Sequence, residues 1–108
     1  MSTKRSEFIT AKKFTKNIDE KMTLGMLMRA FREAEEISQV DLAERLKVSK
    51  QFLSDVENNR KKIGIAFIQK FATEFGFSPD TFLRVYLRDQ LRDAGMKDYD
   101  VHLTKRAS

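Results

Sequence analysis

The stretch of sequence that decides the fold is SQVDLAERLKVSKQFLSDVEN, residues 38–58. In its first half, Ser38 stands where a side chain can cap a helix, and Asp41 occupies the third position after it, as in a capping box. The apolar residues Leu42, Ala43 and Leu46 then recur at helical spacing. This pattern predicts a short helix that begins directly after Ser38.

The second half of the stretch predicts another short helix. The apolar pattern breaks at residues 47–49, where Ser49 provides a second N-cap. Leu53 and Val56 then form the buried stripe, which leaves polar side chains on the outward face. These outward residues are Lys50, Gln51, Ser54, Asp55 and Asn58. Donors and acceptors of this kind can read base edges in the major groove of DNA, which admits an α-helix.

Three motifs in this stretch resemble the helix-turn-helix of the Cro/C1-type repressors, also called the XRE family. They are S-Q-x-x-L-A at 38–43, V-S at 48–49 and L-S-x-V-E-N at 53–58. The resemblance extends over residues 24–83 and implies an all-α domain of five helices that binds double-stranded DNA. The family usually has Gly where Lys47 and Asn59 stand. A left-handed non-glycine residue costs about 1 to 2 kcal/mol, although Asn tolerates that conformation better.

The resemblance also implies roles for individual residues. Helix 50–58 becomes the recognition helix, with Lys50, Gln51, Ser54 and Asp55 as base-reading candidates. Gln39 is expected to contact a phosphate and to brace the base-reading side chains. An ion pair of the family corresponds here to Arg32 and Glu57. The remaining phosphate candidates are Ser49 and Asn58, together with the cationic run beside the recognition helix, Arg60, Lys61 and Lys62.

The motif lies within a domain that we predict to span residues 23–95. Thr23 caps a first helix, which is expected to end near Ile37. A fourth helix is stopped by Gly76, and Ser78-Pro79 opens a fifth helix that ends before Gly95. The inner stripe of the first helix comprises Leu24, Leu27, Met28, Phe31 and Ala34, and that of the fourth comprises Ile65, Ile68, Phe71, Ala72 and Phe75.

The fifth helix carries more apolar surface than one flank of a small bundle needs. We therefore predict that it forms a homodimer interface, through Val85, Tyr86, Leu87 and Leu91. The tail at 96–108 contains Tyr99, Val101 and Leu103 in alternation with polar residues. This alternation is compatible with a short strand that pairs with a second copy, and equally with a disordered tail.

The N-terminal extension, residues 1–22, contains six Lys or Arg against three Asp or Glu. Ala11, Phe14, Ile18 and Met22 recur at helical spacing after Thr10, which favours a short helix over a disordered basic arm. Its lysines are then either a solvated face or contacts to phosphate.

Composition argues against an enzyme. The chain contains no cysteine and only one histidine, His102, so neither a metal site nor a catalytic triad is expected. Its scattered glycines form no phosphate-binding loop, and we expect no cofactor. No apolar run is long enough to span a membrane, and the N-terminus lacks a signal-peptide core, so we expect a cytoplasmic protein.

These observations predict a dimeric, sequence-specific DNA-binding regulator of transcription. A repressor is favoured because occupying a promoter requires no separate activation or ligand domain, and none is visible in the sequence. The alternative is an antitoxin, which would bind a toxin protein as well as its own operator.

Overall fold

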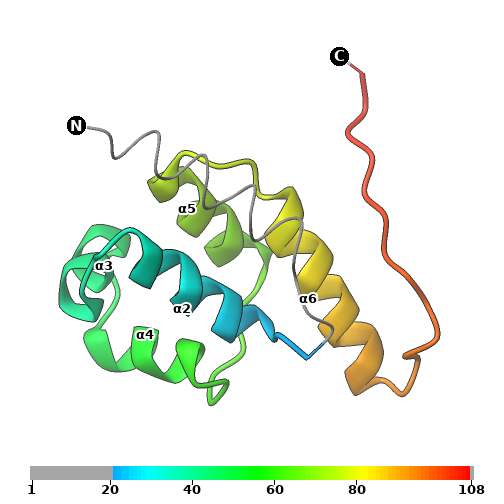
Figure 1. The fold of residues 1–108 in the computed structure, drawn as a ribbon, viewed down its shortest axis with the longest axis horizontal. Helices are drawn as coiled ribbons and strands as arrows, with labels where there is room; N and C mark the ends of the chain where they lie inside the picture. The colour runs from blue at the N-terminus through cyan, green and yellow to red at the C-terminus, as the bar shows by residue number, and fades with distance from the viewer. Residues whose placement is uncertain (1–20, 108) are drawn as a thin grey trace.

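The computed structural model describes residues 21–107, and five helices lie within them (Figure 1). These helices are α2 (Leu24–Ala34), α3 (Gln39–Leu46), α4 (Lys50–Glu57), α5 (Ile65–Phe75) and α6 (Asp80–Asp93). No strand occurs among the described residues, and the all-α prediction is confirmed. The helix predicted after Thr10 lies outside the described residues except for its last two positions. Within residues 21–107, no helix is both long and apolar enough to cross a bilayer.

The predicted N-caps of α2, α3 and α4 are present. The side-chain oxygens of Thr23, Ser38 and Ser49 accept hydrogen bonds from the backbone amides of Met26, Asp41 and Phe52, at 3.2, 3.0 and 2.9 Å respectively. These bonds satisfy amides that have no partner inside the helix. The start of α6 differs by one residue, because the helix begins at Asp80 and not at Pro79.

All five helices end in the same way. A left-handed residue follows each helix, and the amide of the next residue bonds to a carbonyl five positions earlier, as in the Schellman motif. The left-handed residues are Glu36, Lys47, Asn59, Gly76 and Gly95. The φ angles of 59° at Lys47 and 61° at Asn59 show that both keep the backbone geometry for which the family usually has Gly. Glu36 was not foreseen, and it ends α2 at Ala34, earlier than the predicted position near Ile37.

The core is built from the apolar stripes of the five helices. Phe82 of α6 lies at its centre, with ring centroids 5.0 Å from Phe31 and 5.3 Å from Phe71. Aromatic pairs at such distances bury large apolar areas and add a specific ring geometry. Two residues predicted for the inner stripes lie outside the core. Ile65 is 55% exposed in the first turn of α5, and Ala34, the last residue of α2, is only half-buried.

Two helices approach closely at Gly25. A Cβ atom at this position would lie 2.2 Å from the carbonyl oxygen of Val56, so only glycine fits without moving the backbone. The start of α2 therefore packs directly against the end of α4. This contact helps to fix α4 on the scaffold.

Candidate nucleic-acid interface

The C-terminal end of α4 is held in place by a buried ion pair. Glu57 is 2% exposed, and its Oε2 and Oε1 accept hydrogen bonds from Nε and Nη2 of Arg32 at 2.7 and 3.0 Å. Arg32 also donates from Nη1 to the carbonyl oxygen of Ile37 at 2.8 Å. The two residues paired by resemblance thus lie together. Their bidentate contact ties α4 to α2 and to the turn that follows α2.

Gln39 joins this network from the start of α3. Its Nε2 donates to Oε1 of Glu57 at 2.9 Å, in a partly buried contact. Oε1 of Glu57 therefore accepts hydrogen bonds from both Arg32 and Gln39. The bond uses one of the two hydrogens on Nε2, and the second is left for another acceptor. This geometry suits a side chain that braces α4 and also contacts a phosphate.

The outward face of α4 carries the base-reading candidates. Lys50 and Gln51 are exposed, whereas Ser54 and Asp55 are half-buried. Asp55 accepts two hydrogen bonds on Oδ1, from Nε2 of Gln51 at 2.9 Å and from Nε of Arg60 at 3.1 Å. A carboxylate thus links a base-reading candidate to a phosphate candidate. The spacing of residues 51 and 55 signalled the first contact, but nothing in the sequence signalled the second.

Two of the phosphate candidates already hydrogen-bond the ends of α4. Oγ of Ser49 accepts from the amide of Phe52, and Nδ2 of Asn58 donates to the carbonyl oxygen of Ser54 at 2.8 Å. Ser49 is exposed at the N-terminus of α4, where the helix dipole favours an anion. Phe52 packs against the core, and the centroid of its ring lies 5.5 Å from that of Phe67.

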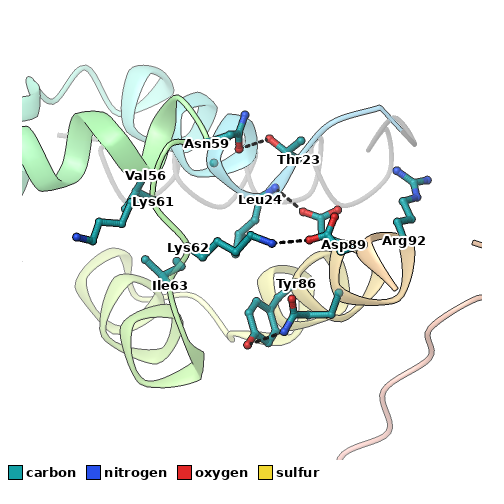
Figure 2. A pocket seen from close by; sticks show the side chains of 13 residues that line it. Thr23, Leu24, Val56, Asn59, Lys61, Lys62, Ile63, Tyr86, Asp89 and Arg92 are labelled. Carbon is teal, nitrogen blue, oxygen red and sulfur yellow. Dashed lines mark hydrogen bonds and ion pairs between the residues drawn. The ribbon is translucent and has the colours of Figure 1, made fainter. Parts of the chain in front are cut away.

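The two lysines of the cationic run extend in different directions (Figure 2). Lys61 points away from α6, and its Nζ lies 5.5 Å from the centroid of the Phe52 ring. Lys62 extends toward α6, where its Nζ lies 2.7 Å from Oδ2 of Asp93. The hydrogen bond to Asp93, together with charge attraction, raises the pKa of Lys62. This ion pair directs Lys62 toward α6 and uses one of the three hydrogens on its Nζ.

A further set of contacts joins α2, the α4–α5 loop and α6 around a pocket of about 550 Å³ (Figure 2). The hydroxyl of Thr23 donates to Oδ1 of Asn59 at 2.8 Å, and Oδ2 of Asp89 accepts from the amide of Leu24 at 3.1 Å. Sequence reasoning missed these contacts. Their partners are far apart in the chain, and no local pattern couples them.

The predicted dimer residues on α6 differ in exposure. Val85 is fully buried in the core of this chain, so it cannot present its side chain to a second copy. The prediction was wrong for Val85 because this residue lies on the same inward face of α6 as Phe82. Tyr86, Leu87 and Leu91 are half-buried and remain candidates. The tail contains no strand within the described residues.

A short helix, a three-residue turn and a second helix with a polar outward face define a helix-turn-helix DNA-binding domain. A family model described as helix-turn-helix matches residues 28–82, about half of the chain. The protein therefore belongs to the Cro/C1-type helix-turn-helix family, whose members are DNA-binding regulators of transcription. Comparisons with curated proteins and with solved structures give no match.

Proposed function

We propose that the protein is a homodimeric repressor that recognises a specific operator by placing α4 in the major groove. One observation carries this proposal. Lys50 and Gln51 project from the first turn of α4, while Glu57 at its other end is fixed in a buried ion pair. A recognition helix needs both features, since base contacts require exposed side chains at one end of the helix and a backbone that is held in place.

The base-reading candidates have complementary chemistry. Lys50 can donate to O6 and N7 of guanine, and the amide of Gln51 can pair with N6 and N7 of adenine. Asp55 can accept from N4 of cytosine or N6 of adenine, and Ser54 can donate or accept. Because Asp55 repels phosphate, it favours a binding geometry in which its carboxylate oxygens accept a hydrogen bond from the amino group of a base.

The phosphate contacts are assigned to the residues that surround α4. Gln39, Ser49 and Asn58 lie at the helix ends, and Arg60, Lys61 and Lys62 follow in the next loop. Each cation that neutralises a phosphate adds about 0.9 to the slope of log affinity against log salt concentration. These contacts fix the register of the domain on the duplex, whereas the outward face of α4 supplies specificity.

Dimerisation follows from the size of the domain. One recognition helix of eight residues reads few base pairs, and two-fold proteins of this kind read half-sites about one helical turn apart. Tyr86, Leu87 and Leu91 provide half-buried apolar surface on α6 for a second copy. Repression requires only that the dimer occupy a promoter.

A second candidate function is that of an antitoxin. The exposed apolar side chains Tyr99 and Leu103 in the tail favour this alternative, because such residues suit a protein partner. The two functions are compatible, since an antitoxin of this fold can also repress its own operon.

The substitution Gln51→Ala tests the proposed function. On an operator identified by footprinting, we expect a loss of about 1 to 3 kcal/mol in binding free energy and relaxed specificity at one base pair. Scrambled DNA should bind almost as before. The matched control is Gln69→Ala, an exposed glutamine on α5. Equal losses of Gln51→Ala on operator and scrambled DNA would refute base reading by this residue.

A further inference from the structure

After α6 the C-terminal tail turns back, and its backbone runs alongside that helix (Figure 1). A hollow of about 330 Å³ separates the two, lined by Arg84, Arg88 and Arg92 of α6 and by tail residues including Val101 and His102. No backbone hydrogen bond joins residues 100–107 to the rest of the described chain. The polar groups of this backbone are therefore available to a partner.

The side chains of the tail alternate in character as those of a strand do. Tyr99 is 60% exposed and Leu103 is 42% exposed, with half-buried Val101 between them. In an extended chain these three residues share one face, while Asp100 and His102 share the other. An unpaired extended backbone with one apolar face is a template for another strand.

The segment is complementary to itself in one antiparallel register. When Val101 lies opposite Val101 of a second copy, Tyr99 lies opposite Leu103 and Asp100 lies opposite His102. All apolar residues then pair with apolar residues, which is the cross-strand arrangement that stabilises a sheet. Centring the pair on Asp100 would instead oppose two carboxylates. Centring it on His102 would place Tyr99 against Lys105.

We infer that residues 98–104 pair with the same segment of a second copy as an antiparallel two-stranded ribbon centred on Val101. The inference rests on the proposed homodimer and names the segment that joins its subunits. Two isolated strands are marginally stable in water, so the ribbon needs a helix to pack against. Leu87 and Leu91 on the half-buried flank of α6 offer that surface.

Cysteine cross-linking in the full chain tests this register, because the natural sequence contains no cysteine. Opposed residues in an antiparallel pair have Cα atoms about 4.5 to 5.5 Å apart, within the range that a disulfide spans. Val101→Cys should therefore give a covalent dimer under mild oxidation. Asp98→Cys and Thr104→Cys are the matched controls, since each lies about 20 Å from its own copy in this register.

The two controls have a second use. When Asp98→Cys and Thr104→Cys proteins are mixed and allowed to exchange subunits, they should cross-link, because these positions lie opposite each other. Cross-linking of each single variant with itself would instead indicate a parallel pair and overturn the inference. So would a Val101→Cys protein that sediments as a dimer without forming a disulfide. That last result would leave the proposed dimeric repressor intact, whereas a native protein that is monomeric in sedimentation and binds DNA singly would refute the dimer itself.

Discussion

Two carboxylates of α4, Glu57 and Asp55, each bind an arginine, but in opposite environments. Glu57 points inward, where its side chain is 0% exposed and that of Arg32 is 10% exposed. Asp55 points outward, with its side chain 27% exposed and that of its partner Arg60 59% exposed. Only two positions separate the carboxylates, and on a helix this spacing places them on different faces.

The difference in exposure decides what each pair can do. Removing one partner from a buried pair leaves a charge without compensation, so the inner pair acts on stability. An exposed pair is screened by water and salt and contributes little to stability, so its members can exchange partners at small cost. The inner pair therefore ties α4 to the scaffold, and in the proposed function the outer pair is the one that acts on DNA.

The largest effect should come from breaking the inner pair. Arg32→Ala would leave Glu57 buried without its bidentate partner and should lower the free energy of unfolding by about 3 to 5 kcal/mol in urea melts. The control is Arg29→Ala, which breaks an exposed pair with Glu33 on the same helix and should barely move the midpoint. A loss below roughly 1 kcal/mol for Arg32→Ala would show that the inner charges act independently.

An intermediate effect should follow from the change Gln39→Ala. This substitution removes one hydrogen bond to Glu57 but leaves the ion pair, so the expected loss in unfolding free energy is about 1 kcal/mol. If Gln39 also contacts a phosphate, Gln39→Ala should lower operator affinity by more than the control Gln69→Ala on α5 does. A Gln39→Ala protein with unchanged stability and unchanged affinity would assign Gln39 to neither role.

The inner pair could be predicted from sequence, and the outer pair could not. Arg32 and Glu57 occupy positions of a known family motif, and Ser38, Ser49 and Thr23 are local cap signals. Arg60 meets Asp55 only because Asn59 is left-handed, and that turn brings the Arg60 amide back to the carbonyl oxygen of Asp55 at 2.8 Å. Such a contact depends on the path of a loop, which no periodicity encodes.

Burial on α6 shows the same limit. The helix itself was predictable from its apolar spacing, but the sequence did not separate core residues from candidate interface residues. Val85 is enclosed by the core, whereas Leu87 and Leu91 are only half-buried. The choice depends on how α6 rotates against α2 and α5, which is decided by the packing of Phe82 between Phe31 and Phe71.

The smallest change in stability, and the sharpest test of the outer pair, should come from Asp55→Asn. The unfolding free energy should change by less than about 1 kcal/mol, because the pair with Arg60 is exposed. On the operator a base amino group engages Asp55 and releases Arg60 to a phosphate, whereas on scrambled DNA native Arg60 stays paired with Asp55. In the variant Arg60 is released on scrambled DNA as well and can neutralise a phosphate there. We therefore expect scrambled DNA to bind more tightly, with a salt slope that is steeper by about 0.9. The difference in binding affinity between operator and scrambled DNA should therefore become smaller.

The matched control for this prediction is Asp80→Asn, which makes the same change of charge at the exposed first turn of α6. Measuring both variants across a salt series separates a local effect on Arg60 from the general effect of one added unit of net charge. On scrambled DNA, the double variant Asp55→Asn with Arg60→Ala should return the slope to its native value, because the released cation is then absent. A steeper slope that persists in this double variant would mean that Asp55 acts by repelling phosphate directly and not through its hold on Arg60.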